Sequence, residues 1–335
     1  MIFRGEGFLS SAIDVSVLCL FFNRPKQFRQ VFEQVKKARP SKLFLYQDGP
    51  RNEKDMAGIL ECREIANQID WECEVHTNYQ ERNFGCDPSG YLSQTWAFSL
   101  TDKCIIIEDD IVAGVDFFKF CKILLDRYES DPRVSMIAGI NYEGVTKYCP
   151  YDYFFTSDVA IWGWATWKRV IEARDVKYSF LDERYNEVLV NQNIRVRNLR
   201  NFMPKFKQCK DADKQYFEFL TLSAQLLNSG LCIVPSKNMI RNIGMIGEST
   251  HFNSASFKSL PKSLQRLATQ KIYEIGGEIN HPRYVIEDYS YNARINVLLA
   301  RNSAIRKLCQ SVSTLCKRIR YGEFGAIIKS IIKRL

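Results

Sequence analysis

The stretch Cys104-Ile-Ile-Ile-Glu-Asp-Asp-Ile-Val112 places three consecutive carboxylates directly after a short apolar run. A continuous β-branched run of this kind is typical of a strand buried on both faces of a parallel sheet. Ligands of such sheets bind beyond the carboxyl ends of the strands, where Glu108, Asp109 and Asp110 fall. Three adjacent acids repel one another, and a hard divalent cation such as Mn²⁺ or Mg²⁺ offsets that repulsion. We therefore interpret the run as a metal–diphosphate site; the competing interpretation is a solvated acidic turn after a core strand.

The segments around this run alternate between strand-like and helix-like patterns. Apolar runs predict strands at residues 15–22, 42–47, 71–77 and 133–140, and helical periodicity predicts helices at residues 26–38, 52–68, 88–100 and 116–128. Strands that alternate with helices of this length are typical of βαβ units. The expected fold class is α/β, with a mainly parallel central sheet flanked by helices. Residues 10–290 read as one continuous domain, followed by a basic helical tail at residues 291–335.

The composition is that of a globular chain with a large core and free thiols. Of the 335 residues 46% are hydrophobic, yet the longest apolar runs are far shorter than the roughly 18 residues that a membrane span needs. The 11 cysteines form no CxxC pair and no metal-finger spacing, and no secretory signal opens the sequence. This combination predicts a reducing compartment and hence a cytoplasmic location.

The net charge of +9 is concentrated in the C-terminal tail. Residues 301–335 hold nine basic side chains and the single acid Glu323, so they account for eight of the nine positive charges. A nucleic-acid-binding protein more often carries its charge on the folded domain, so no nucleic acid is expected as a partner. Residues 301–320 and 324–335 combine apolar seams with basic flanks, a pattern typical of helices that lie on an anionic membrane, here the inner face of the cytoplasmic membrane. For residues 301–320 the alternatives are packing on the main domain or pairing in a homodimer.

Several nucleotide-binding motifs are absent from the sequence. There is no GxxxxGK[ST], so the acids are not part of a P-loop ATPase site, and no GxGxxG follows the first expected strand. The first strand ends instead at Arg24-Pro25, and the second ends at Asp48-Gly49. This arrangement favours a nucleotide-sugar site. Taken alone, Asp48-Gly49-Pro50 is also a typical turn, and Arg24 is equally a surface ion-pair partner.

The order of several short motifs resembles a known enzyme family. The segments are VSVLCLFFNRP (15–25), LFLYQDGPR (43–51), IDWECEV (69–75), ERNFGC (81–86), IIIEDDIV (105–112), DFFKFC (116–121) and IWGWATWKR (161–169). Together they resemble bacterial family-2-like glycosyltransferases with a GT-A fold, which are similar in turn to the N-acetylglucosaminyltransferase I group and its EDD metal motif. The likeness continues through NSGLCIVPSKNMIRNIG (228–244) and HPRYVIEDYSYN (281–292).

The resemblance implies a role for each matching residue. Asp48 would accept a hydrogen bond from the base of a uridine nucleotide, and Arg24 would lie beside the base or the diphosphate. Glu108 and Asp109 would face the ribose and the water shell of the metal. Asp110 would bind the cofactor, Mn²⁺ or Mg²⁺, which neutralises charge on the UDP that leaves the UDP-sugar donor.

An inverting transferase also needs a base that takes the proton of the acceptor hydroxyl. The family carries an Asp in a Trp-Asp-Tyr-Gln-like patch ahead of an NNGL segment, and here the matching text is Asp211-Ala-Asp-Lys-Gln-Tyr216. The resemblance implies Asp213 as the base, with Asp211 as a substitute. Ala212 and Lys214 depart from the family pattern, and Lys214 would lower the basicity of a neighbouring carboxylate. For both acids the alternative is an ordinary acid at a helix N-terminus.

Two further segments supply candidate ligand contacts. Trp162 and Trp164 either stack on a sugar or pack in the core, whereas Trp167 of the same segment is expected in the core. Asp158 is a candidate for a sugar hydroxyl. His251 ends the loop Gly244-Met-Ile-Gly-Glu-Ser-Thr-His251, whose two glycines suit a lid that closes over the nucleotide sugar. The alternative for His251 is a solvated loop histidine.

The sequence therefore predicts a metal-dependent, inverting hexosyl- or N-acetylhexosaminyltransferase. It would move a sugar from a UDP-sugar to a glycan or lipid-linked saccharide acceptor in surface polysaccharide synthesis. One alternative is a catalytically degenerate GT-A fold that acts as a glycan-binding or assembly subunit, motivated by the altered patch around Asp213. Another is a nucleotidyltransferase, which would release pyrophosphate rather than UDP.

Overall fold

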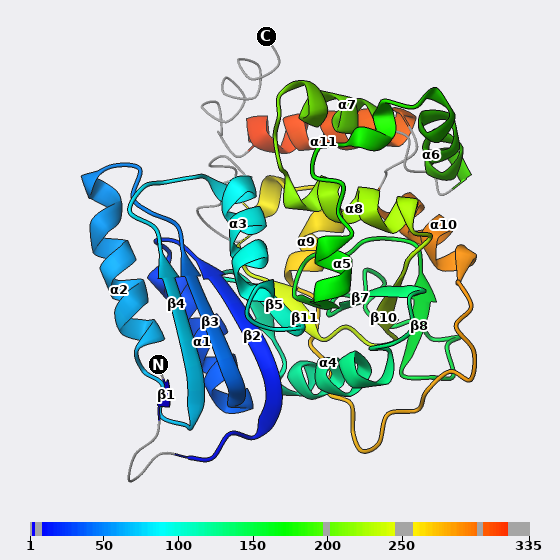
Figure 1. The fold of residues 1–335 in the computed structure, drawn as a ribbon. Helices are drawn as coiled ribbons and strands as arrows, with labels where there is room; N and C mark the ends of the chain where they lie inside the picture. Colours follow the sequence, from blue (N-terminus) through cyan, green and yellow to red (C-terminus); the bar gives the residue numbers. More distant parts are fainter. Residues whose placement is uncertain (1, 4–8, 197–201, 245–256, 300–303, 321–335) are drawn as a thin grey trace.

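The computed structural model describes residues 2–3, 9–196, 202–244, 257–299 and 304–320, and a nine-stranded mixed sheet forms their centre (Figure 1). The strand order is β1-β4-β3-β2-β5-β9-β7-β10-β8. The strands are β1 (Ile2–Phe3), β2 (Ile13–Phe21), β3 (Pro40–Gln47), β4 (Cys73–Tyr79), β5 (Lys103–Glu108), β7 (Val134–Ala138), β8 (Tyr153–Thr156), β9 (Trp164–Trp167) and β10 (Leu231–Pro235). Most of the sheet is parallel and helices flank it, so the predicted α/β class is confirmed.

The first four long strands fix where a ligand would bind. β4, β3, β2 and β5 are parallel neighbours, with β2 between β3 and β5. The chain builds outward from β2 through β3 to β4, then returns to place β5 on the other side of β2. This reversal makes the carboxyl ends of β2 and β5 a topological switch point, where open α/β sheets bind their ligands. Leu20 pairs with Glu108 and Phe21 with Gln47, so the three strands end at the same edge.

The antiparallel strands lie in the second half of the sheet. β9 is antiparallel to both of its neighbours, β5 and β7, so β5 and β7 point in the same direction. β10 is parallel to β7, and β8 at the edge is antiparallel to β10. A separate two-stranded sheet pairs β6 (Ile111–Ala113) with β11 (Ile240–Asn242). β6 begins directly after the last of the three acids. This small sheet therefore fixes the path of the chain as it leaves the acids.

The helices of the first half follow the pattern that the sequence predicts. They are α1 (Pro25–Ala38), α2 (Met56–Ala66), α3 (Cys86–Phe98) and α4 (Val115–Arg127), with the short 3-10 turn η1 (Glu53–Asp55) before α2. In α1 the buried residues Phe28, Val31, Phe32 and Val35 recur at helical spacing and form one apolar face. Pro25 opens the helix where its missing N–H costs no hydrogen bond.

The second half adds helices around a smaller core. They are α5 (Lys168–Glu172), α6 (Arg184–Val196), α7 (Phe202–Asp211), α8 (Phe217–Leu227), α9 (Lys262–Ala268), α10 (Tyr289–Leu298) and α11 (Ala304–Arg320), with the 3-10 turns η2 (Ser179–Leu181) and η3 (Phe257–Ser259). Figure 1 shows α6, α7 and α8 gathered at the upper right of the view. Their apolar faces form a second cluster that includes Tyr178, Phe206 and Leu220.

The start of the predicted tail belongs to the main core. The boundary expected after residue 290 falls inside α10, whose Tyr291 and Ile295 are buried in the main hydrophobic cluster. Within the segment at residues 301–320 the described residues form α11, which begins at Ala304, whereas residues 324–335 lie outside the described part of the chain. Within the described part, no helix is long and apolar enough to cross a membrane.

Candidate functional site

A cavity of about 950 Å³ opens at the switch point of the sheet. Its walls come from the segments that follow β2 and β3, from the loop at residues 83–86, and from Glu108 and Asp109 at the end of β5. The volume lies in the range of about 300–1,000 Å³ that is typical of small-molecule sites. The cavity therefore brings together Arg24, Asp48, Glu108 and Asp109, which the sequence singled out separately.

Arg24 holds two of the three consecutive acids. Its guanidinium donates to both carboxylate oxygens of Asp109, through Nη2 and, at 3.3 Å, through Nε. Nη2 also lies 3.1 Å from Asp110 Oδ2. The backbone N–H of Phe22 donates to Asp109 Oδ2 at 3.3 Å, so Asp109, which is 3% exposed, fastens the end of β2 to the end of β5. Burial alone would lower the pKa of Arg24, but Asp109 and Asp110 outweigh it and raise the pKa.

The pKa of Glu108 is raised by burial and by its position in the acidic cluster. Burial, followed by the charges of Asp110 and Asp109, raises its pKa from 4.5 to about 8. Arg24 opposes this shift but does not cancel it. The single positive charge of Arg24 therefore does not neutralise the three carboxylates, and the acidic cluster is short of positive charge.

Asp110 is enclosed by the segment that leaves β11. The backbone N–H of Ile243 donates to the carbonyl of Asp110 at 2.8 Å. A Cβ atom at Gly244 would lie 2.0 Å from Asp110 Oδ2, so any larger residue there would displace this carboxylate from its present position. No group of three or more His, Cys, Asp or Glu side chains among the described residues forms a metal cage. A Mg²⁺-type ion commonly takes one or two protein carboxylates and fills its shell with water and phosphate oxygens, so Asp110 in a cluster short of positive charge fits such an ion.

The N-terminus of α3 forms another wall of the cavity, which the sequence analysis did not single out. Gly85, Cys86, Ser89 and Gly90 all line the cavity. Gly85 caps the helix with a φ of 88° and no side-chain cap. The N-terminus of a helix is its positive end and a ready site for anions. The signal in the sequence was the Gly85 that precedes the predicted helix.

Asp48 is occupied by hydrogen bonds from its own chain. Oδ1 accepts from the backbone N–H of Gly49 and of Phe84, both at 2.9 Å. Oδ2 accepts from Asn83 Nδ2 at 2.8 Å and from the N–H of Gly85 at 3.0 Å. A carboxylate has about four acceptor positions, so these four donors fill it. In the structure Asp48 therefore holds the loop at residues 83–85. Contact between Asp48 and a nucleotide base would require one of these hydrogen bonds to break.

Asp55 is a supporting residue that the sequence analysis missed. Its carboxylate accepts from Asn23 Nδ2 at 2.6 Å and from Arg51 through N, Nε and Nη2 at 2.7–3.0 Å. Asn23 and Arg51 both line the cavity, one after β2 and the other after β3. Asp55 therefore couples the two loops that carry Arg24 and Asp48. Its position beside the Asp-Gly-Pro-Arg turn was the available signal.

The tryptophan segment belongs to the sheet. Trp164 opens β9 and is 1% exposed, so its ring is enclosed by protein and the proposed stacking on a sugar is not possible in this structure. Trp162 is half-buried against Tyr142, with ring centroids 6.4 Å apart, and it does not line the 950 Å³ cavity. Asp158 is buried outside that cavity as well. Trp167 lies in the core as expected, where its Nε1 donates to the carbonyl of Leu125 at 3.0 Å.

The candidate bases lie in the turn between α7 and α8. Asp211 is the last residue of α7, and Asp213 lies two residues further on, in the turn, with a φ of 47°. The alternative interpretation of both as acids at a helix N-terminus was therefore wrong. Asp213 is exposed and accepts from Gln215 Nε2 at 3.2 Å. It does not line the cavity, but Phe217, which opens α8, does. His251 lies outside the described residues.

Comparison of the chain with protein-family models and with curated proteins found no match to either.

Proposed function

We propose that the chain is a metal-dependent glycosyltransferase that transfers a sugar from a UDP-sugar to a saccharide acceptor. The observation that carries the proposal is the meeting of Arg24, Glu108, Asp109 and the N-terminus of α3 in one cavity at the switch point. Asp110 does not line the cavity itself but lies beside it, 3.1 Å from Nη2 of Arg24. A nucleoside diphosphate needs cationic partners for its phosphates and hydrogen-bonding partners for its ribose and base. The motif resemblance described above supports the choice of UDP and of a GT-A fold.

Arg24 and α3 supply the anion-binding part of the proposed site. The guanidinium presents a planar fork of donors that matches phosphate oxygens as well as it matches Asp109 and Asp110. Diphosphate bound beside it would share this fork, while the positive end of α3 faces the same space. Mn²⁺ or Mg²⁺, when bound at Asp110, would supply Lewis-acid stabilisation of the leaving diphosphate. Glu108 lies next to these groups and can hydrogen-bond a ribose hydroxyl in either protonation state.

The acceptor side of the proposed site is the turn between α7 and α8. Phe217 lines the cavity, and Gly90 of α3 allows its ring to pack closely, since a Cβ at Gly90 would lie 2.4 Å from the ring. Asp213 stands four residues before Phe217 and has an exposed carboxylate. In our proposal Asp213 takes the proton of the acceptor hydroxyl as that oxygen attacks the anomeric carbon, and UDP leaves from the opposite face.

We also propose that α11 rests on an anionic membrane. Val312, Leu315 and Ile319 are 44–52% exposed and recur at spacings of three and four residues. Arg318 and Arg320 lie on the same helix, and Lys317 Nζ donates to the carbonyl of Leu260 at 3.1 Å, which ties the helix to the domain. Each basic side chain near an anionic surface contributes about 1 kcal/mol. A membrane-bound acceptor such as a lipid-linked saccharide would suit this arrangement.

Equilibrium binding of UDP is the direct test of the proposed donor site. We expect UDP to bind the full chain in the presence of Mn²⁺ or Mg²⁺, and we expect a chelator to weaken this binding. Pyrophosphate release from a nucleoside triphosphate and a sugar phosphate would point instead to a nucleotidyltransferase. Saccharide binding without any UDP binding would favour the glycan-binding alternative.

A further inference from the structure

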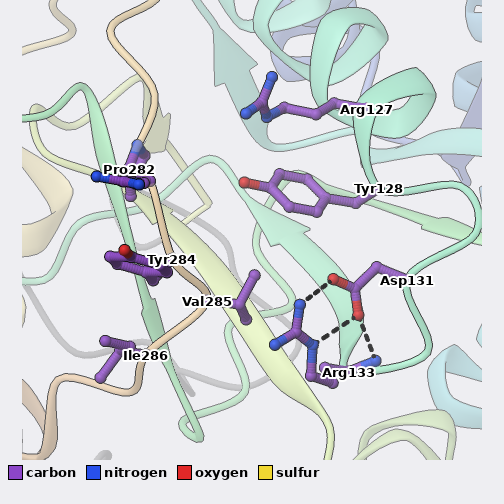
Figure 2. Close-up of a pocket in the computed structure, with 9 residues that line it drawn as sticks. Arg127, Tyr128, Asp131, Arg133, Pro282, Tyr284, Val285 and Ile286 are labelled. Carbon is purple, nitrogen blue, oxygen red and sulfur yellow. Dashed lines mark hydrogen bonds and ion pairs between the residues drawn. The ribbon is translucent and has the colours of Figure 1, made fainter.

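A second cavity, of about 570 Å³, is shown in Figure 2. The strand directions place it at the opposite edge of the sheet from the candidate site. It is bounded by the C-terminal end of α4, by the turn into β7 and by residues 282–286. β7 points in the same direction as β5, so the turn at its first residue, Val134, lies at the amino edge of the parallel strands. The 13 residues of α4 separate the acids from this cavity by about 20 Å at 1.5 Å per residue. We call it the α4–β7 cavity.

The α4–β7 cavity has an excess of positive charge. Arg127, Arg133 and Arg283 line it together with one acid, Asp131. Figure 2 shows Arg133 turned onto Asp131, with Nε and Nη2 donating at 3.0 and 2.7 Å. No ion pair joins Arg127 or Arg283 to a carboxylate within the described residues. Arg127 interacts with the hydroxyls of Tyr128 and Tyr153, and Arg283 lies over the Tyr284 ring, so the positive charge of neither guanidinium is neutralised by these contacts.

The acids just outside the cavity are already paired. Asp126 forms ion pairs with Lys103, whose Nζ lies 2.6 Å away, and with Lys122. Glu129 forms an ion pair with Lys103 Nζ at 3.3 Å. They therefore compete weakly with an incoming anion for Arg127 and Arg283.

A positively charged side chain, Arg169, also stands just beyond the negative end of α4. The last carbonyls of a helix carry partial negative charge that would repel an anion. Arg169 donates to the carbonyl oxygens of Tyr128, Asp131 and Val134 at 2.8–3.3 Å. This arginine offsets the end of α4 and fixes the turn that carries Asp131 and Arg133. The cavity therefore keeps its positive character although it lies at a helix C-terminus.

An exposed aromatic and apolar edge lies beside the arginines. Tyr284 is 61% exposed and Ile286 is 69% exposed, both on the segment that faces the end of α4 across the cavity. The guanidinium of Arg283 stands 5.2 Å from the Tyr284 ring centroid. An open aromatic face suits the C–H surface of a sugar ring, and arginine forks suit its carboxylate.

We propose that the α4–β7 cavity binds an acidic saccharide, namely a glycan whose sugars carry carboxylate groups. Arg127 and Arg283 would pair with the carboxylates, and Tyr284 would pack against a sugar ring. The identification of this saccharide as the growing or acceptor glycan rests on the proposed transferase function. The binding site itself needs no donor and no turnover.

Isothermal titration of the full chain with an oligogalacturonate tests the proposal, with the methyl ester of the same oligosaccharide as the neutral control. We expect the acid form to bind at least tenfold more tightly than the ester. Arg127→Gln combined with Arg283→Gln should weaken binding of the acid form at least tenfold, and Tyr284→Ala should weaken it several-fold. Arg29→Gln, which removes an exposed arginine of α1, should leave it unchanged.

Three results would overturn the proposal. Equal binding of the ester would remove the role of the arginines. Inorganic sulfate that displaces the oligosaccharide, with no effect of Tyr284→Ala, would reduce the cavity to a plain anion site. Polyglutamate that binds as tightly as the oligosaccharide would point to an acidic peptide. Because no UDP is present, failure here is distinguishable from failure of the proposed transferase activity.

Discussion

At the scale of single residues, Arg24 is the group that makes three adjacent acids compatible with a folded chain. It lies at the first turn after β2 and neutralises Asp109, which is buried, and Asp110. A buried carboxylate that loses its partner keeps its desolvation cost, so the acids and Arg24 depend on one another. A bound diphosphate and cation would enter this same network. In our proposal the same residues therefore have both a structural and a ligand-binding role.

Asp48→Asn should destabilise the protein by about 1–3 kcal/mol, because the amide group that replaces one oxygen would face two N–H donors. Urea unfolding measures the change, and Asp14→Asn, at an exposed carboxylate that accepts one bond from Ser41, should stay within about 0.5 kcal/mol of wild type. Equal stability of the two variants would contradict the loop-holding role of Asp48.

Asp55→Asn should destabilise the protein at neutral pH and much less in acid. The bonds from Arg51, with a smaller opposing effect of burial, lower the pKa of Asp55 from 3.8 to about 2. A lowered carboxyl pKa stabilises the fold above the unfolded value, and this contribution is lost as the pH falls from about 4 to about 2. The difference between wild type and variant in urea unfolding should therefore shrink between pH 7 and pH 3. A difference independent of pH would show that the charge of Asp55 is not what stabilises the loops.

Gly244→Ala should disturb the acidic site, because the added methyl group would meet the Asp110 carboxylate. We expect at least tenfold weaker binding of Mn²⁺ together with UDP, with little change in the circular dichroism spectrum. Gly276→Ala is the matched control, since a Cβ at Gly276 would contact nothing within 4 Å. Unchanged binding in Gly244→Ala would mean that Asp110 does not have to keep its present position.

The site residues differ in how far the sequence could identify them. Glu108, Asp109 and Asp110 follow a buried strand, and Arg24 ends another, so strand pattern alone brought them to one edge. Asp55 could not be found in this way, because its role arises from contacts with loops that meet only after the sheet is built. The sequence left Trp164 undecided between a core position and a ligand platform, because a strand of four residues gives too little periodicity to separate the two.

At the scale of elements, the long periodic segments of the first 140 residues were predicted well, whereas the short strands and the helices α6, α7 and α8 were not predicted. Residues 26–38 and 116–128 match α1 and α4 to within about a residue, because each carries one apolar stripe. The strands β6, β9 and β11 have three or four residues each and were missed. Their pairing is decided by contacts between distant segments rather than by local pattern.

The exposed stripe of α11 gives a prediction for this element. Leu315→Ser combined with Ile319→Ser should strongly reduce binding of the full chain to vesicles that contain anionic phospholipid, measured by co-sedimentation. Val188→Ser combined with Leu189→Ser on α6 is the control, because these side chains are 37–38% exposed and similarly apolar. Loss of binding in both double variants, or in neither, would contradict a specific role of α11.

At the scale of the whole molecule, one sheet presents two cavities of different character at its two edges. The carboxyl edge carries the acids, Arg24 and the start of α3, and the amino edge carries the α4–β7 cavity. α4 runs from one to the other, starting just after β6 and ending at Arg127. An enzyme that extends an acidic glycan could in this way hold the chain at one edge and its growing end at the other.

UDP release from a panel of UDP-sugars in the presence of Mn²⁺ is the decisive measurement of the proposed transferase activity. We expect at least one UDP-sugar to yield UDP with the wild type and with Asp14→Asn, and we expect Asp110→Asn to lower the rate about 100-fold or more, equivalent to about 3 kcal/mol of leaving-group stabilisation. Release that is unaffected by Asp110→Asn would contradict the proposed metal site, and the absence of both release and Mn²⁺-dependent UDP binding in the wild type would contradict the transferase proposal.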